Sequence, residues 1–275
     1  TMHQHDLAHY AKKFEAFGWD ALVVDGHDMQ EVLDAFKHAG SCSRPCAIIA
    51  KTVKGKGVSI LENSGGWHGK PLSRAQLETA LGEIGAADVR LPSRVTSMPV
   101  SHTPSGFEPG IYRKDEMLST REAFGRALVR LGKTDPTAVA LDADVMNSTM
   151  TEGFFREFPE RGFQAFLAEL NMACMAAGLS ALGFKPFVAT FASFLTRAYD
   201  FIRMAQYSRS NIKFAGSHAG ISIGADGPSQ MGLEDIPMFL SMPDAVVVYP
   251  CDAVSAEHLV SAMAGHTGIS YIRLT

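Results

Sequence analysis

The feature that most constrains the fold of this 275-residue chain is a regular alternation of short apolar runs with segments of helical periodicity. In the second half of the chain, the apolar runs are residues 138–142, 186–190, 212–217, 245–249 and 269–273. Runs of this length predict strands buried on both faces, and the segments between them predict helices. Strands that alternate with helices at this spacing predict a doubly wound parallel sheet.

The first half of the chain repeats the design on a smaller scale. Residues 20–25 and 46–52 predict two strands, with a helix between them that Asp28 can cap. Residues 7–18 predict a preceding helix, and Ser73 predicts the cap of a helix that ends near Gly85. We therefore expect two doubly wound parallel-sheet units, of which the first is incomplete.

A proline-rich segment separates the two predicted units. Between residues 86 and 117 the prolines are Pro92, Pro99, Pro104 and Pro109, spread among Ser, Thr and Gly without a sustained apolar period. Such a composition is typical of a linker. The sequence predicts a first domain over residues 1–85, a linker over 86–117 and a second domain over 118–275. The first helix lacks a preceding strand and the chain stops two residues after Arg273, so we expect a fragment or one part of a split enzyme.

Composition excludes several classes of partner and compartment. The net charge of −4 offers no basic face for nucleic acid, and no apolar run is long enough to cross a membrane. The N-terminus lacks the apolar region of a secretory signal. The four cysteines lack paired spacing, and Cys42 and Cys46 have no second Cys/His pair at zinc spacing. We expect a cytoplasmic protein with ordinary thiols.

One acid stands out in the run Phe166-Leu-Ala-Glu-Leu-Asn-Met172. We interpret this run as a strand that delivers Glu169 to the start of a helix over residues 172–183, at the sheet edge where ligands bind. The alternative is a helix-start glutamate that satisfies backbone N–H groups. A second polar cluster, residues 143–149, follows the strand 138–142 at the same predicted edge.

Glycine-rich loops follow the predicted strand 46–52. They are Lys54-Gly-Lys-Gly57 and Gly65-Gly-Trp-His-Gly-Lys70, in which backbone can approach a ligand closely. The alternative interpretation is a mobile surface loop. His68 favours a functional role, because a histidine titrates near neutral pH.

Four segments together carry a resemblance to a known family. They are Trp67-His-Gly-Lys-Pro71, residues 166–172, residues 190–200 and residues 216–230 (GSHAGISIGADGPSQ). They resemble transketolase, a thiamine-diphosphate enzyme that moves two-carbon ketol units between sugar phosphates. The resemblance covers nearly the whole chain, from the end of the pyrophosphate-binding domain through most of the pyrimidine-binding domain. It implies that both units are of the thiamine-diphosphate-binding type.

The resemblance implies roles for particular residues. Glu169 matches the carboxyl group that bonds the aminopyrimidine ring, a role that requires burial to raise the pKa of Glu169. Phe194 matches the aromatic residue that packs on that ring. We expect Phe187 and Phe191 to be plain core residues. Lys54 and His68 match groups near the diphosphate and thiazolium, and His68 also matches a proton shuttle to the sugar oxygen. Gln230 matches a cofactor contact that is histidine in many relatives, which indicates the animal-type branch; its alternative is a helix-start polar residue.

Further matches concern the substrate, a ketose phosphate such as xylulose 5-phosphate or sedoheptulose 7-phosphate and an aldose phosphate such as ribose 5-phosphate or glyceraldehyde 3-phosphate. Arg121, Ser148 and His218 match phosphate contacts. Asp226 matches the acid that recognises a donor hydroxyl, although a turn role is the alternative for an Asp before Gly-Pro. Asp144 is a weaker candidate near the cofactor.

The resemblance also implies partners that the chain does not itself contain. The ligands of Mg²⁺, or Ca²⁺, are expected upstream of Thr1, so we predict no metal site in this chain and little activity without a complementary chain. A homodimer with active sites at the subunit interface is implied. Rival interpretations are dihydroxyacetone synthase, deoxyxylulose-phosphate synthase, a subunit of a 2-oxo-acid dehydrogenase, and a non-catalytic assembly subunit. The run Ser217-His-Ala-Gly220 and the segment 67–70 favour transketolase over the second and third of these.

Overall fold

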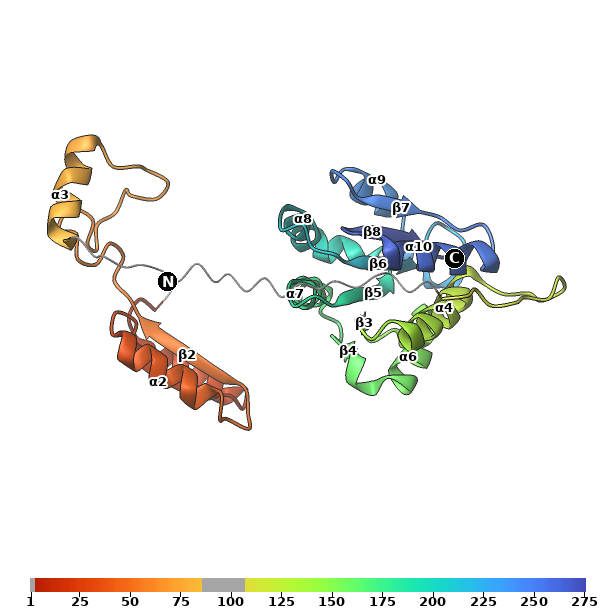
Figure 1. Cartoon of the computed structure of the whole chain (residues 1–275), viewed down its shortest axis with the longest axis horizontal. Helices are drawn as coiled ribbons and strands as arrows, with labels where there is room; N and C mark the ends of the chain where they lie inside the picture. Colours follow the sequence, from red (N-terminus) through yellow and green to blue (C-terminus); the bar gives the residue numbers. More distant parts are fainter. Residues whose placement is uncertain (1–2, 86–106) are drawn as a thin grey trace. The chain divides into compact units, whose positions relative to one another are not determined.

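The structure is a computed structural model that describes residues 3–85 and 107–275 (Figure 1). The chain separates into two compact units, Thr1–Arg94 and Val95–Thr275, each described here by itself. Most of the predicted linker, residues 86–106, lies outside the described residues. The domain limits 1–85 and 118–275 stay predictions.

The first unit pairs two parallel strands, with Asp20 opposite Cys46 in the register. Its elements are α1 (Leu7–Ala16), β1 (Asp20–Asp25), α2 (Met29–Ala39), β2 (Cys46–Lys51) and α3 (Arg74–Ile84). The two predicted caps are confirmed. Asp28 accepts hydrogen bonds from the backbone N–H groups of Gln30 and Glu31, and Ser73 forms a capping box with Gln76.

The second unit is a six-stranded sheet in the order β4-β3-β5-β6-β8-β7, in which every pairing is parallel. Its strands are β3 (Ala138–Asp142), β4 (Gly162–Gln164), β5 (Lys185–Phe191), β6 (Lys213–Ser217), β7 (Val246–Val248) and β8 (Ser270–Arg273). Its helices are α4 (Thr120–Thr134), α5 (Met146–Thr149), α6 (Glu152–Glu157), η1 (Pro159–Arg161), α7 (Glu169–Ala181), η2 (Phe194–Ala198), α8 (Tyr199–Tyr207), η3 (Gly224–Asp226), η4 (Pro228–Gln230), α9 (Asp235–Leu240) and α10 (Ala253–Gly265). The predicted α/β fold with two parallel sheets is confirmed.

Helices cover both faces of the larger sheet, as Figure 1 shows with α7 and α8 on one side and α4 and α10 on the other. Successive side chains of a strand point to opposite faces, so each central strand contributes to two cores. Val139 and Leu141 of β3 join one cluster with residues of α7 and α8, whereas Ala138 and Ala140 join the other with residues of α4 and α10. This burial fixes the strand register and hence the positions of the strand ends.

The predicted strand that reaches Glu169 is wrong. Strand β4 ends at Gln164, and α7 begins at Glu169 rather than at residue 172. Between them Phe166 adopts a positive φ of 54°, and the side chains of Phe166 and Leu167 are 65% and 74% exposed. The apolar run is therefore a turn at the surface of this chain that leads into a helix, and Glu169 is the first helical residue.

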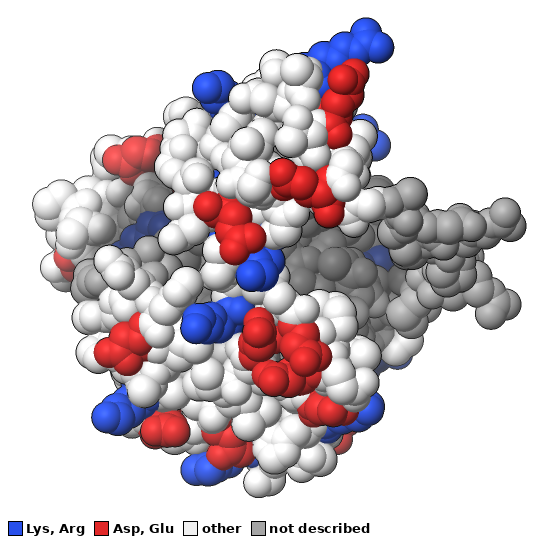
Figure 2. Space-filling view, turned by 90° about the vertical axis from the view of Figure 1, so that its left-hand side faces the viewer, with Lys and Arg blue, Asp and Glu red and all other residues white. Residues whose placement is uncertain are grey.

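Charge is mixed on the described surface that Figure 2 shows, where Lys and Arg side chains are interspersed with Asp and Glu. Within residues 3–85 and 107–275, each helix is too short or too polar to cross a membrane.

Candidate active site

The carboxyl ends of three neighbouring strands bring the candidate residues of the second unit together. Strands β3, β5 and β6 are adjacent in the sheet and end at Asp142, Phe191 and Ser217. The segments that follow them carry Ser148, Phe194 and His218, respectively. Parallel strands present their carboxyl ends at one edge, which is where open α/β sheets bind ligands.

Arg121 is the centre of one group of predicted residues. Ser119 caps α4 through a capping box with Glu122 and so places Arg121 in the first turn of the helix. The Arg121 Nη1 atom donates a hydrogen bond to the backbone oxygen of Ser148 at 3.2 Å and lies 2.7 Å from His218 Nε2. The structure therefore brings Arg121, Ser148 and His218 together, although Ser148 contacts Arg121 through its carbonyl rather than its hydroxyl.

The protonation of His218 follows from these contacts. Because a guanidinium can only donate, His218 Nε2 accepts, and the ring proton lies on Nδ1, 3.0 Å from Ser217 Oγ. Burial and the neighbouring Arg121 charge lower the pKa of His218, while Asp226 acts in the opposite direction. At neutral pH the site thus combines a neutral imidazole with a guanidinium.

A cavity of about 310 Å³ opens beside this pair. It is lined by Ser119, Arg121, His218, Ser222, Ile223, Asp226 and Thr275. The guanidinium and the start of a fifteen-residue helix both favour an anion in this cavity, whereas Asp226 offers an acceptor for a hydroxyl group. The arrangement can bind a molecule that carries a phosphate and hydroxyl groups.

Glu169 and Phe194 belong to a second group, which Arg197 joins. The Glu169 side chain is only 3% exposed, and Arg197 Nη1 donates to its Oε1 atom at 2.5 Å. The guanidinium carbon of Arg197 lies 4.3 Å from the centre of the Phe194 ring. The structure thus places one planar cation against both residues to which the resemblance gives pyrimidine contacts.

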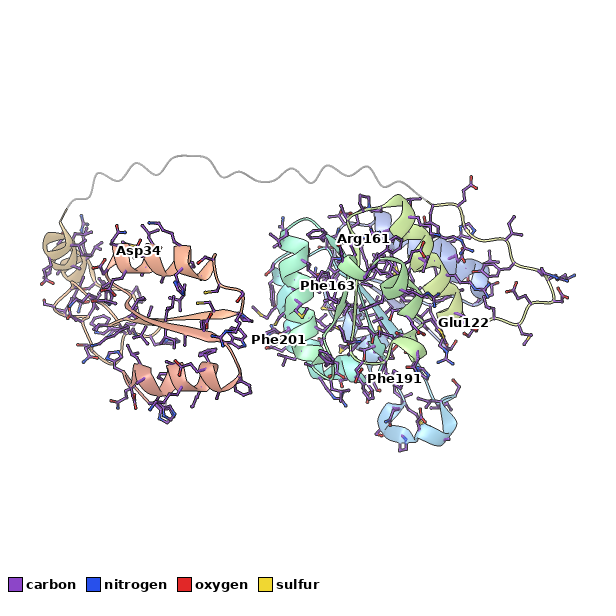
Figure 3. All side chains as sticks on the ribbon, turned by 90° about the horizontal axis from the view of Figure 1, so that it is seen from below. Asp34, Glu122, Arg161, Phe163, Phe191 and Phe201 are labelled. Carbon is purple, nitrogen blue, oxygen red and sulfur yellow. The ribbon has the colours of Figure 1, made fainter. Side chains whose placement is uncertain are left out.

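Phe191 is buried, as expected of a core residue, and it also connects the two groups. Its ring, labelled in Figure 3, stacks on Phe194 with centroids 5.0 Å apart and on His218 with centroids 4.1 Å apart. Phe187, by contrast, lies in the core as expected. The position of Phe191 at the end of β5 was the available signal, because the last residue of a strand borders the ligand edge.

Asp142 is a further residue that sequence reasoning did not single out. It is fully buried at the end of β3, and its carboxylate accepts hydrogen bonds from the Val145 N–H at 2.7 Å, Thr149 Oγ1 at 2.6 Å and Thr151 Oγ1 at 2.9 Å. Burial raises the pKa of Asp142. These bonds fold the segment 143–151 and so hold Ser148 in reach of Arg121.

The remaining candidates lie apart from these contacts. Asp144 is exposed, with a φ of 63°, and its N–H donates to Gln164 Oε1 at 2.8 Å. Gln230 accepts a hydrogen bond from Ser229. In the first unit Lys54 lines a cavity of about 150 Å³ with Gly55, Leu61, Trp67, Lys70 and Leu72, and His68 is exposed on the same loop.

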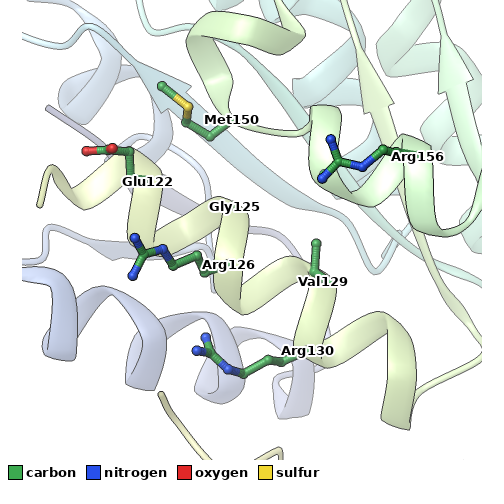
Figure 4. Close-up of a pocket in the computed structure, with 8 residues that line it drawn as sticks. Glu122, Gly125, Arg126, Val129, Arg130, Met150 and Arg156 are labelled. Atoms are coloured by element: carbon green, nitrogen blue, oxygen red, sulfur yellow. The ribbon is translucent and has the colours of Figure 1, made fainter. Parts of the chain in front are cut away.

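A separate cavity of about 450 Å³ lies between α4 and α6 (Figure 4). Three arginines line it, but Arg126 and Arg130 already pair with Glu116 and Glu257. It contains none of the predicted site residues. Within the described residues, no group of three His, Cys, Asp or Glu side chains could hold a metal ion.

Comparisons with known proteins find relatives of both units of the chain. Residues 116–275 match the family described as "Transketolase, pyrimidine binding domain", and residues 3–101 match "Transketolase, thiamine diphosphate binding domain". Human transketolase is 43% identical over 278 residues, covering 98% of this chain and 44% of its own length. Mouse transketolase-like protein 2 is 43% identical over 285 residues, covering 99% and 45%. The chain therefore spans less than half the length of these relatives.

Solved structures of transketolases share the fold of this chain. Transketolase from Campylobacter jejuni superposes with a TM-score of 0.82 at 24% identity, covering 96% of this chain and 48% of its own. A structure described as "Split gene transketolase, inactive beta4 tetramer" superposes with a TM-score of 0.52 at 42% identity, covering 57% of this chain and 51% of its own.

Proposed function

The chain belongs to the transketolase family, and on that premise we propose that it supplies part of the active site of a transketolase. The reaction transfers a two-carbon ketol unit from a ketose phosphate to an aldose phosphate, as in the pentose phosphate pathway. Thiamine diphosphate supplies the carbanion chemistry when it is bound. The residues of this chain bind and orient the cofactor, hold the substrate phosphate and move protons.

The contacts of Arg197 are the observation that carries the proposal. A planar, nitrogen-bearing group donates to Glu169 at 2.5 Å and lies 4.3 Å from the Phe194 ring centre. An aminopyrimidine ring needs the same two contacts, a hydrogen bond to a carboxyl group and a stack on an aromatic face. The described side chains thus fit that part of the cofactor. Glu169 would bond its ring nitrogen, and Gln230 would be a further contact.

In a homodimer, the first unit would serve the other active site, at the diphosphate end of the cofactor bound there. We assign Lys54 and His68 to the diphosphate and thiazolium, and His68 also to proton transfer at the sugar oxygen. We place the Mg²⁺ or Ca²⁺ ligands upstream of Thr1. The active enzyme would then need a homodimer, and a complementary chain if the upstream part is a separate polypeptide. The four free cysteines of this chain fit a cytoplasmic location.

The cavity beside Arg121 supports the substrate class. Arg121 and His218 would hold the phosphate, with Ser148 in the same group, and Asp226 would accept a hydrogen bond from a donor hydroxyl. A sugar phosphate offers both kinds of group. Asp144, exposed and outside this cavity, has no assigned role.

The test is ketol transfer from xylulose 5-phosphate to ribose 5-phosphate by the protein assembled with the part that carries the metal site. We expect Glu169→Gln to lower kcat by at least about 100-fold, because a positioned proton-transfer group contributes about 10²–10⁴-fold. The exposed residue Glu160 supplies the matched control, Glu160→Gln, which should retain full activity. An unchanged rate in Glu169→Gln would contradict the proposal.

A non-catalytic assembly subunit is the second candidate. The split-gene structure, which is 42% identical over 57% of this chain, is described as an inactive tetramer, and that description favours this alternative. The two candidates differ in cofactor binding by the full assembly. A subunit without a catalytic role would leave thiamine diphosphate affinity unchanged when Glu169 is replaced by Gln.

A further inference from the structure

We propose that Arg197 is a placeholder for the cofactor's aminopyrimidine ring. It holds the Glu169 carboxylate in the cofactor-free chain and gives up that position when the ring binds. This inference rests on the proposed function, since it requires Glu169 and Phe194 to be cofactor contacts. Arg197 is thereby a positioning residue, to which the resemblance assigned no role.

The burial of Glu169 creates the need for a cation. Its side chain is 3% exposed, and an ionised carboxylate at that depth is costly unless it is paired. Arg197 supplies the partner through the 2.5 Å hydrogen bond from Nη1 to Oε1. Arg197 therefore compensates for the burial of the Glu169 carboxyl group in the cofactor-free chain.

The Arg197 guanidinium and a pyrimidine ring cannot both lie against Phe194 at the same time. Phe191 stacks nearly parallel to Phe194, with an angle of 4° between the rings. The Arg197 guanidinium also lies over the Phe194 ring, 4.3 Å from its centre, while it donates to Glu169. A ring that bonds Glu169 and stacks on Phe194 has to displace it.

The exposure of the two partners decides which one moves. The Arg197 side chain is 54% exposed and comes from the short helix η2, whereas Glu169 is buried at the start of α7. A guanidinium that already reaches water can rotate into solvent at small cost in hydration. Glu169 would stay in place and exchange the hydrogen bond from Arg197 for one in which it shares a proton with the ring nitrogen.

Cofactor affinity of the full assembly tests the exchange. Thiamine diphosphate with Mg²⁺ should bind Arg197→Met about three- to tenfold more tightly than wild type, because the competing cation is gone. Arg203→Met is the matched control: Arg203 also pairs with a carboxylate, Asp200, and lies over an aromatic ring, Tyr207. The dissociation constant of Arg203→Met for thiamine diphosphate should equal that of the wild type.

Stability of the cofactor-free chain gives a second, independent readout. Arg197→Met should lower the melting temperature by about 2–8 °C. Glu169→Gln should largely restore it in the double variant, since the buried charge has been removed. A merely structural arginine would also lower the melting temperature, but Arg197→Met would then bind thiamine diphosphate equally or less tightly. That result would overturn the placeholder. Equal affinity of wild type and Glu169→Gln would instead overturn the proposed function.

Discussion

Arg121 Nη1 lies 2.7 Å from His218 Nε2, so the guanidinium and the imidazole share one hydrogen bond at the wall of the 310 Å³ cavity. The pair is held from both sides, by Ser119 at the start of α4 and by the end of β6. A cation next to an imidazole disfavours protonation of the ring. The contact therefore links the charge state of His218 to the presence of the Arg121 guanidinium.

Removal of Arg121 should raise the pKa of His218. The Arg121 charge is the second cause of the lowered pKa after burial, so Arg121→Gln should move the pKa upward without restoring it fully. An NMR titration of the His218 ring protons measures the shift. Arg126→Gln on the same helix is the control, and a lower or unchanged pKa in Arg121→Gln would contradict the electrostatic coupling.

The same substitution should weaken sugar-phosphate binding in the active assembly. A charge-assisted hydrogen bond to a phosphate contributes about 1.5–3 kcal/mol, so we expect the KM for xylulose 5-phosphate to rise by about 10- to 100-fold. A ketose donor without a phosphate provides the comparison. If KM for both donors rose equally, Arg121 would not be the phosphate contact.

Asp142 should be required for the stability of the segment that carries Ser148. Its carboxylate accepts three hydrogen bonds, whereas the amide of Asp142→Asn can replace only part of them and leaves a buried donor unpaired. We expect the free energy of unfolding to fall by about 1–3 kcal/mol. Chemical denaturation measures this loss, and Asp144→Asn, at an exposed position nearby, should change it by less than about 0.5 kcal/mol.

Local signals account for the parts of the structure that the sequence predicts well. The caps at Asp28 and Ser73 depend on side-chain contacts with backbone two or three residues away. The buried strands β3 and β5 appear as short apolar runs, because both of their faces are covered. Such features can be identified without knowledge of the tertiary structure.

The contacts of the candidate site depend on tertiary structure. Glu169 and Arg197 are 28 residues apart, and their pairing requires both η2 and the start of α7 to be in place. The stack of Phe191 on His218 likewise joins the ends of two different strands. The turn at Phe166 was missed because its positive φ has no signature in an apolar run. The sequence therefore predicts a role for Glu169 but does not reveal its contact with Arg197.

Gly125 should be irreplaceable in α4. A Cβ atom there would lie 2.3 Å from the Met150 backbone oxygen, which cannot move without disturbing the segment 143–151. We expect Gly125→Ala to lower the free energy of unfolding by at least about 1–3 kcal/mol. Gly178 in α7 is the matched control, since its Cβ would meet no atom within 4 Å, and Gly178→Ala should raise stability by about 0.5–1 kcal/mol. Equal effects of the two substitutions would contradict the close approach of α4 to Met150.

Lys213 should make the stability of the chain depend on pH above neutrality. It is fully buried in β6, where its Nζ atom donates to Asn211 Oδ1 at 2.6 Å and to the backbone oxygens of His266 and Gly268 at 2.7 and 2.9 Å. Burial, with a smaller effect of the Lys185 charge, lowers its pKa to about 7. An unfolded lysine has a pKa of about 10.4, so between these values the unfolded chain binds more protons at this site.

The sign and size of the effect follow from that difference. Lys213 should make the free energy of unfolding rise with pH above about 7, by up to about 1.4 kcal/mol per pH unit. Denaturation at several values between about pH 7 and 8.5 measures the slope before thiols ionise extensively. Lys213→Met should lower the slope by that amount, whereas Lys133→Met, which removes an exposed lysine, should retain it. Equal slopes in wild type and Lys213→Met would mean that the buried lysine remains charged at neutral pH, with its three acceptors compensating for the loss of water.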